Sequence, residues 1–275
     1  MSSTPEIPII PRIKLDTILN VISKGFHIDK RPLLSYRTVE VIKNIAPNAD
    51  SSVLVKLGHT QVLVGIKIDI GQPFPDNPEE GVLIVNAEYI PAASPSFEPG
   101  PPDENAIELA RVIDRALRES KAIALDKLTI IPGKKVWMLW LDIYVLDHDG
   151  NLIDAAMIGS MMALAQLKVP YFEVDQITGS VKVDKSKYTA PLQINRYVAT
   201  VTVYKIGDML LVDPTAEEEA IASASITISI SEEGNIVAIQ KRGLGFFLER
   251  EIEQAVEISL SKGKELIELI KRLSS

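Results

Sequence analysis

The sequence contains no cysteine and only three histidines, His27, His59 and His148, which lie far apart along the chain. The absence of cysteine excludes a disulfide framework, a thiolate zinc site, an iron–sulfur cluster and a cysteine nucleophile. The sequence also lacks a run of about 18 apolar residues and an N-terminal signal with a charged and then an apolar region. We therefore expect no membrane-spanning segment and a cytoplasmic location.

Basic residues are outnumbered by acidic ones. The chain has 29 Lys and Arg residues against 37 Asp and Glu residues, which gives a net charge of −8. This balance excludes a surface that is basic all round and binds nucleic acid or anionic lipid indiscriminately, although a local basic stripe is compatible with it. Of the 275 residues, 46% are hydrophobic and 24% are charged, which is typical of a folded globular protein.

Apolar periodicity predicts four helices. A short helix ends near Gly25, and a second begins after Asp103, which is a suitable N-cap, and runs to about residue 121. The segment Ile153–Leu167 is apolar on nearly every side, so we expect a buried helix there. A C-terminal helix extends from Glu249 to about Leu273, with Gly263 as a weak position.

Alternating and continuous apolar runs, separated by glycine, proline and polar turns, predict strands between these helices. The expected strands are residues 53–57, 62–70, 82–90, 135–146, 198–203, 209–212, 225–231 and 236–240. Strands and helices recur in two successive sets, at roughly 50–167 and 195–273, without sequence repetition. We expect one α+β domain over residues 1–275, with an N-terminal extension (1–23) and two similarly built halves (roughly 24–190 and 191–275).

Motifs for catalysis are missing. The sequence has no P-loop, no G-x-G-x-x-G after a strand, no G-x-S-x-G and no H-E-x-x-H. The carboxylates of residues 213–219 are candidates for binding a divalent cation, but such an acidic run is more typical of a solvated face or of the start of a helix. The three histidines follow a helix or lie in turns, where surface imidazoles are common, and we assign none of them a role.

Three arginines of the second predicted helix, Arg111, Arg115 and Arg118, are spaced by four and three residues and share one face. Their planar donors suit a row of successive phosphates. The alternative is that they form ordinary ion pairs on the helix surface, namely Glu108–Arg111, Asp114–Arg118 and Arg115–Glu119. The spacing alone leaves both interpretations open.

Several segments together resemble a known family. Residues 24–31 (Lys-Gly-Phe-His-Ile-Asp-Lys-Arg) and the hairpin of residues 49–65 are similar to the opening of RNase PH-like proteins. The blocks at residues 97–111, 132–137 and 145–151 resemble, in this order, the non-catalytic RNase PH-like subunit of the archaeal exosome core. The resemblance runs from about Lys24 to the C-terminal helix and implies an RNase PH-like fold.

The chain departs from the catalytic members of this family at two places. Where they carry a phosphate-binding Gly-Thr-Arg, residues 151–153 read Asn-Leu-Ile, which offers neither a hydroxyl nor a guanidinium. Where they carry two aspartates six residues apart, this chain has Glu219 and Ser225, and a serine cannot replace a carboxylate. His27 and Lys30 also stand where an arginine and a glycine are common.

By resemblance, the chain is a subunit without activity of its own. It is expected to pair with a catalytic RNase PH-like subunit, three such heterodimers closing a ring around a channel for single-stranded RNA, with RNA-binding cap proteins as further partners and no membrane contact. The partner would hold phosphate and perform 3′-to-5′ phosphorolysis. The resemblance implies RNA binding by Arg111 and Arg115, with Arg118 behind them, and no catalytic residue, metal or cofactor in this chain.

Two other interpretations remain. The chain is a phosphorolytic exoribonuclease in its own right if the carboxylates of Asp213 and Glu219 suffice for catalysis. It is an oligomerisation subunit of a metabolic enzyme if the assembled protein does not bind single-stranded RNA.

Overall fold

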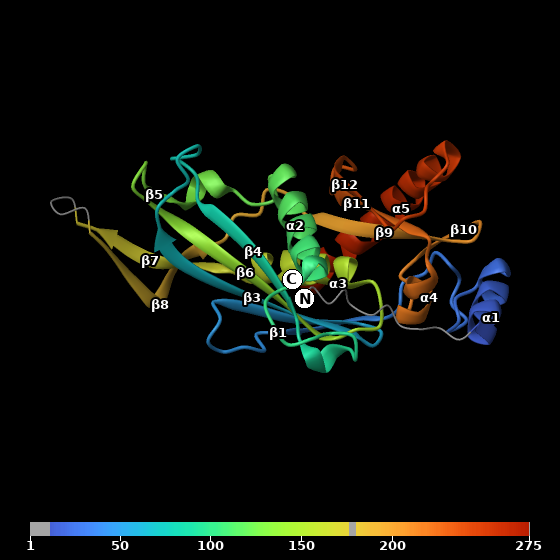
Figure 1. The fold of residues 1–275 in the computed structure, drawn as a ribbon. Helices are drawn as coiled ribbons and strands as arrows, with labels where there is room; N and C mark the ends of the chain where they lie inside the picture. The colour runs from blue at the N-terminus through green and yellow to red at the C-terminus, as the bar shows by residue number, and fades with distance from the viewer. Residues whose placement is uncertain (1–11, 176–179, 275) are drawn as a thin grey trace.

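The computed structural model describes residues 12–175 and 180–274 as two β-sheets packed around helices (Figure 1). The helices are α1 (Arg12–Ser23), α2 (Glu104–Glu119), α3 (Leu152–Gln166), α4 (Ala216–Ile221) and α5 (Glu249–Ser274), with short 3-10 turns at Pro91–Ala93 and Leu125–Leu128. The strands are β1 (Val39–Lys43), β2 (Ser51–Leu57), β3 (Thr60–Gly71), β4 (Val82–Tyr89), β5 (Thr129–Ile131), β6 (Lys135–Asp147), β7 (Lys168–Val174), β8 (Val181–Pro191), β9 (Val198–Ile206), β10 (Met209–Val212), β11 (Ala224–Ser231) and β12 (Ile236–Arg242).

Each half of the chain contributes one main sheet. The first has the order β1-β2-β3-β6-β4, with β5 added beside β6, and β4 runs parallel to β6 while the other pairs are antiparallel. The second is antiparallel, with the order β10-β9-β11-β12. The expected α+β class and the two similarly built halves are therefore present.

Helix α3 lies between the two sheets and is buried over almost its whole length, as its apolar sequence predicts. It packs against β2 and β3 of the first sheet and against β9 of the second. A side chain at Gly159 would place its Cβ 2.8 Å from Val64 Cγ2, so glycine allows the helix to approach the sheet closely. One continuous hydrophobic core therefore includes residues from both halves.

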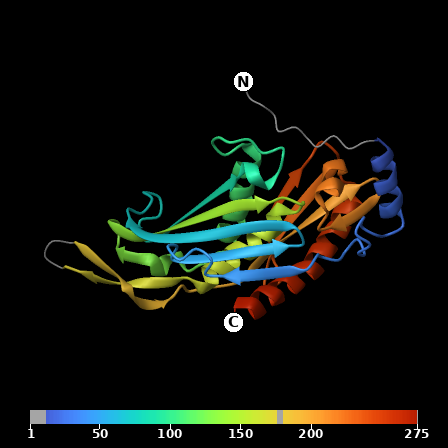
Figure 2. The same ribbon diagram turned by 90° about the horizontal axis from the view of Figure 1, so that it is seen from below.

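Helix α5 runs without a break through Gly263, so the position expected to be weak does not interrupt the helix. Gly263 is buried, and a Cβ at this residue would lie 2.9 Å from Ile230 Cδ1 of β11. The glycine reflects close packing of α5, drawn in red in Figure 2, on β9 and β11 of the second sheet.

The β7–β8 hairpin is absent from the elements that the sequence predicts. It projects from one end of the molecule, and α1 lies at the opposite end (Figures 1 and 2). Most side chains of β8 are exposed, so the hairpin lacks the apolar alternation from which a strand is recognised. Within the described ranges, no helix is both long and apolar enough to cross a bilayer.

Candidate nucleic-acid interface and the buried polar centre

Helix α2 presents the three arginines that the sequence singles out. The carboxylate of Asp103 accepts a hydrogen bond from the backbone N–H of Ala106 at 2.8 Å, which is the N-cap expected from the sequence. The apolar stripe of the helix is buried and includes Ala106, Leu109, Ala110, Ile113, Ala116 and Leu117. Burial of this stripe against β4 and α3 leaves Arg111, Arg115 and Arg118 on the exposed side.

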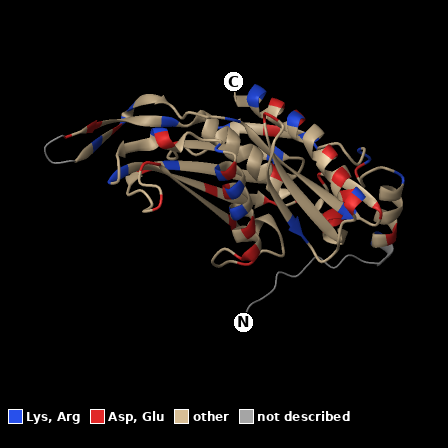
Figure 3. Cartoon of the chain, turned by 90° about the horizontal axis from the view of Figure 1, so that it is seen from above, with Lys and Arg blue, Asp and Glu red and all other residues tan. Residues whose placement is uncertain are grey.

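The three arginines differ in their partners. Arg118 donates to the Asp114 carboxylate at 2.6 Å and to the carbonyl oxygen of Leu83 at 2.9 Å, so this predicted ion pair is confirmed. Among the residues that the structure describes, neither Arg111 nor Arg115 has an ion pair or a side-chain hydrogen bond. Two free guanidinium groups therefore remain on α2, whose exposed side carries both charge signs (Figure 3).

Glu108, the expected partner of Arg111, is engaged elsewhere. Its carboxylate lies 2.7 Å from Nε of Arg242 and accepts a hydrogen bond from Gln240 at 3.2 Å. Both partners lie on β12, so Glu108 fastens the helix to the second sheet. Arg115 lines a small hollow between α2 and the strands β11 and β12, together with Val112, Thr227, Ser229, Ala238, Ile239 and Gln240.

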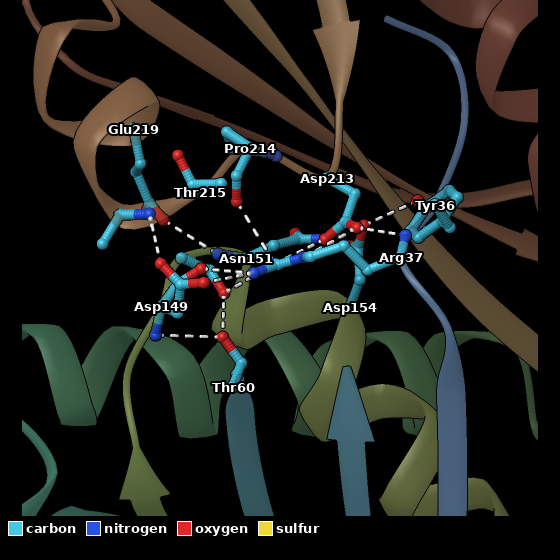
Figure 4. Close-up of polar contacts among 12 residues, drawn as sticks. Tyr36, Arg37, Thr60, Asp149, Asn151, Asp154, Asp213, Pro214, Thr215 and Glu219 are labelled. Atoms are coloured by element: carbon cyan, nitrogen blue, oxygen red, sulfur yellow. Dashed lines mark hydrogen bonds and ion pairs between the residues drawn. The ribbon is translucent and has the colours of Figure 1, made fainter. Parts of the chain in front are cut away.

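A buried polar centre surrounds the start of α3, where catalytic relatives are expected to hold phosphate (Figure 4). Gly150 has φ +82°, and a Cβ there would lie 2.4 Å from the carbonyl oxygen of Pro214, so only glycine fits. Asn151 follows in the left-handed region, and its backbone N–H donates to Glu219 Oε2 at 2.9 Å. The partial positive charge of the helix N-terminus is therefore already matched by a carboxylate of the same chain.

The next two residues of α3 supply no hydrogen-bond donor in their side chains. Leu152 and Ile153 are 8% and 3% exposed and belong to the main hydrophobic core. An external phosphate would have to displace the Glu219 carboxylate and would meet apolar side chains behind it. The Arg37 guanidinium lies beside this helix end, but it already donates to the Asp213 carboxylate and to the carbonyl oxygens of Asp149, Gly150 and Pro214.

Asp213 is fully occupied by basic and amide partners. Its carboxylate accepts hydrogen bonds from the Arg37 guanidinium at 2.7 and 3.0 Å, from Arg31 at 3.2 Å and from the Asn151 amide at 3.0 Å. Glu219 accepts from the Tyr204 hydroxyl at 3.2 Å in addition to the Asn151 N–H. Both carboxylates are therefore engaged in hydrogen bonds within the chain. No group of three potential metal-binding His, Cys, Asp or Glu side chains occurs within the described residues.

Of the two roles expected for the acidic run of residues 213–219, a solvated face or a helix start, the structure shows the helix start. Asp213 and Glu218 are fully buried. Glu218 and Thr215 form a capping box that begins α4, so the expected helix-start role is present.

His27 is not a surface residue and His148 is half-buried, which corrects the expectation for them. His27 is fully buried, and its Nδ1 lies 2.8 Å from Glu218 Oε2. His148 stacks on Phe97 with ring centroids 5.4 Å apart, and burial lowers the pKa of its imidazole. His59 is exposed in the turn between β2 and β3, as expected.

The polar centre was not visible in the sequence because its members come from distant segments. Asp154 is fully buried and accepts hydrogen bonds from the hydroxyls of Tyr36 (2.7 Å), Thr200 (3.2 Å) and Thr202 (2.9 Å). Burial raises the pKa of the Asp154 carboxyl to about 6. The adjacent residues Tyr36 and Arg37 are the local sequence feature that points to this centre, because they place two polar side chains shortly before a predicted strand.

Comparison with known proteins gives a consistent result. The domain 1 model of the 3′ exoribonuclease family, RNase PH, matches residues 35–170, and the domain 2 model matches residues 196–262. The chain belongs to the RNase PH family.

Curated relatives within this family are named "Exosome complex component Rrp42". The protein of Methanopyrus kandleri is 46% identical over 266 residues, which are 97% of this chain and 98% of the relative. The protein of Pyrococcus furiosus is 48% identical over 262 residues, which are 95% of this chain and 94% of the relative.

Solved structures agree. A chain of the structure titled "archaeoglobus fulgidus exosome with RNA bound to the active site" has a TM-score of 0.83 and 42% identity, covering 93% of this chain and 97% of that chain. A chain of "Archaeal exosome core" has a TM-score of 0.80 and 39% identity, covering 94% of this chain and 96% of that chain. The RNase PH-like fold expected from the resemblance is thereby confirmed.

Proposed function

We propose that this chain is a structural and RNA-binding subunit of an archaeal exosome ring. In this role it pairs with a catalytic RNase PH-like subunit, which performs 3′-to-5′ phosphorolysis, and three such pairs close the ring. The names of the relatives and the RNA-bound Archaeoglobus neighbour support this function. One contrast in the chain carries the proposal: α2 has two free arginines, whereas the start of α3 is closed by Glu219, Leu152 and Ile153.

Arg111 and Arg115 contact the RNA backbone in this proposal. Guanidinium groups bind phosphates strongly, and phosphates carry no base identity, so the contact is independent of RNA sequence. Arg118 is held by Asp114 and Leu83, so it contributes less than the other two. The net charge of −8 disfavours RNA binding elsewhere on the surface and directs the strand to this helix.

The chain has no activity alone in this account. Phosphorolysis needs a bound phosphate and a group that transfers a proton, and the two candidates that the sequence singles out, Asp213 and Glu219, are engaged in internal hydrogen bonds. RNA-binding cap proteins on the ring and a cytoplasmic location belong to the same proposal.

We expect the double substitution Arg111→Ala and Arg115→Ala to weaken RNA binding by the reconstituted complex and to flatten its salt dependence. Loss of two phosphate contacts reduces the slope of log K against log salt by about 1.4 for a single strand. Fluorescence anisotropy with labelled single-stranded RNA over a salt series measures this slope.

Arg272→Ala is the matched control, because Arg272 is an exposed arginine on the remote helix α5. It should leave the slope unchanged, and Arg118→Ala should change it less than either free arginine does. An unchanged slope in the double variant would assign Arg111 and Arg115 to ordinary surface charge.

A further inference from the structure

Arg111 lies between two carboxylates of its own helix. Glu108 precedes it by three residues and Asp114 follows it by three, and side chains at this spacing are neighbours on the surface of a helix. An acidic and a basic residue so placed attract each other, and an arginine held in this way is less available to an external phosphate. In the part of the chain that the structure describes, neither carboxylate pairs with Arg111. Other groups hold both of them.

Residues of β12 hold the Glu108 carboxylate through both of its oxygens. Oε2 lies 2.7 Å from Nε of Arg242, and Oε1 accepts a hydrogen bond from the Gln240 amide at 3.2 Å. Arg242 also donates to the Asn105 side chain of α2 at 3.2 Å. The side chains of Arg242 and Glu108 are 28% and 29% exposed, so salt screens this pair less than it screens an exposed one.

Asp114 is engaged in the same manner by a different arginine. Arg118 donates to its carboxylate at 2.6 Å and is itself held by the carbonyl oxygen of Leu83 of β4 at 2.9 Å. Both acidic neighbours of Arg111 are therefore paired with arginines that are anchored to a sheet. The Arg111 side chain stays exposed, with no ion pair to any described residue.

We propose that Arg242 is a positioning residue for RNA binding, which holds Glu108 against β12 and thereby leaves Arg111 available to phosphate. This inference rests on the proposed function, in which Arg111 contacts the RNA backbone. Without the Arg242 guanidinium, the Glu108 carboxylate would carry an unmatched charge three residues before Arg111. It would then pair with Arg111 and repel the incoming phosphate.

Two alternative roles for Arg242 make different predictions. Direct contact of Arg242 with phosphate is disfavoured, because its guanidinium already donates to Glu108 and to Asn105. A role restricted to fastening α2 to the second sheet predicts that loss of either partner of the pair weakens RNA binding. The proposed role predicts opposite effects, since loss of Arg242 weakens RNA binding and loss of the Glu108 charge does not.

The test is a double-mutant cycle on the complex reconstituted with the catalytic RNase PH-like subunit, measured by fluorescence anisotropy with labelled single-stranded RNA over a salt series. Arg242→Met should bind RNA at least about threefold more weakly, and its salt slope should fall by up to about 0.7, the contribution of one phosphate contact. Glu108→Gln should bind at least as tightly as the unchanged chain. The variant with both substitutions should bind as Glu108→Gln does, because no carboxylate is left at residue 108 to capture Arg111.

Arg196→Met is the matched control, because it removes the same charge and breaks an ion pair with Glu233 that does not involve α2. It should bind RNA as the unchanged chain does. Arg242→Lys keeps a cation beside Glu108 and should restore most of the affinity that Arg242→Met loses. Circular dichroism and size-exclusion chromatography verify the fold and the assembly. If Arg242→Met does not assemble, Arg242→Gln, whose amide still donates to Glu108, takes its place in the cycle.

Weaker binding by Arg242→Met that Glu108→Gln does not relieve would overturn the inference and leave the proposed function intact, because Arg242 would then contact RNA itself or only fasten the helix. Unchanged binding by Arg242→Met would overturn the inference as well. In a chain that carries Arg111→Ala, Arg242→Met should have no further effect on RNA affinity. If Arg111→Ala alone leaves RNA binding unchanged, the RNA contact of the proposed function fails together with the inference.

Discussion

Asp154 joins the two halves of the molecule at the level of a single side chain. It lies in the first turn of α3, and Thr200 and Thr202 of β9 and Tyr36 of the N-terminal half donate to its carboxylate. Within the described residues it has no cationic partner. Burial therefore dominates and raises the pKa of the carboxyl from 3.8 to about 6.

This raised pKa sets the direction of a pH effect on stability. Between pH 4 and about pH 6 the folded state holds a proton that the unfolded state releases, so the free energy of unfolding falls as the pH rises through this window. Above pH 6, the buried and charged Asp154 carboxylate lowers the free energy of unfolding by on the order of 3 kcal/mol relative to pH 4 and below. We expect Asp154→Asn to remove this slope, as measured by urea denaturation at several pH values.

Subtracting the free energy of unfolding of Asp154→Asn from that of the unchanged chain at each pH separates the effect of Asp154 from that of the other carboxyl groups. Burial works to raise the pKa of Glu218, but the hydrogen bond and charge of His27 together with the N–H groups of Ile28 and Thr215 lower it below its usual value. The stability that Glu218 contributes is therefore lost as the pH falls. We expect this difference in the free energy of unfolding to fall from pH 4 to pH 6. If it stays constant or grows instead, Asp154 is charged in the folded state over the whole of this range.

The role of a residue could be predicted where its interaction partner lies close to it in the sequence. The spacing of Arg111, Arg115 and Arg118 places them on one helix face, and the i,i+4 rule finds the partner of Arg118. The role of His27 was not predictable, because its partner Glu218 is 191 residues away. Sequence patterns contain no information on such pairs until the topology is known.

At the scale of elements, the turn before α3 decides how the two halves meet. Gly150 approaches the backbone of residues 214–216 so closely that a Cβ would lie within 2.9 Å of three backbone atoms. The same turn brings the carbonyl oxygen of Gly150 to the hydroxyl of Thr60 at 2.7 Å. The start of α3, β3 and the β10–α4 loop are therefore fitted to one another at this point.

Gly150→Ala should destabilise the fold by more than its backbone angle alone explains. Gly234 has the same φ of +82° but nothing within 4 Å of a Cβ, so Gly234→Ala is a matched control for the conformational cost. We expect about 1 kcal/mol for the control and at least about 2 kcal/mol more for Gly150→Ala. If urea denaturation shows the same loss in free energy of unfolding for both variants, the turn at Gly150 accommodates an alanine without added strain.

Periodicity predicted the elements that face the core and missed those that do not. Helices α2 and α3 and the β9–β10 and β11–β12 hairpins were expected at nearly their observed bounds, because each buries a regular apolar face. Strand β1 and the β7–β8 hairpin are largely exposed and carry no such pattern. The parallel pairing of β4 with β6 depends on a crossover that no local signal specifies.

At the scale of the whole molecule, the main hydrophobic core extends through both sheets and α5, and a smaller cluster lies beneath α1. We propose on this basis that the two halves fold as one domain, since neither half would bury α3 alone. On the surface, α2 offers two arginines, Arg111 and Arg115, that have no ion pair or side-chain hydrogen bond among the described residues.

The most direct test of this account is phosphate-dependent shortening of 5′-labelled single-stranded RNA, followed for the purified chain alone, the catalytic RNase PH-like subunit alone and the reconstituted complex. The account predicts no shortening by the chain alone, shortening by the complex, and slower shortening when the complex contains Arg111→Ala and Arg115→Ala. Phosphate-dependent shortening by the chain alone would contradict it.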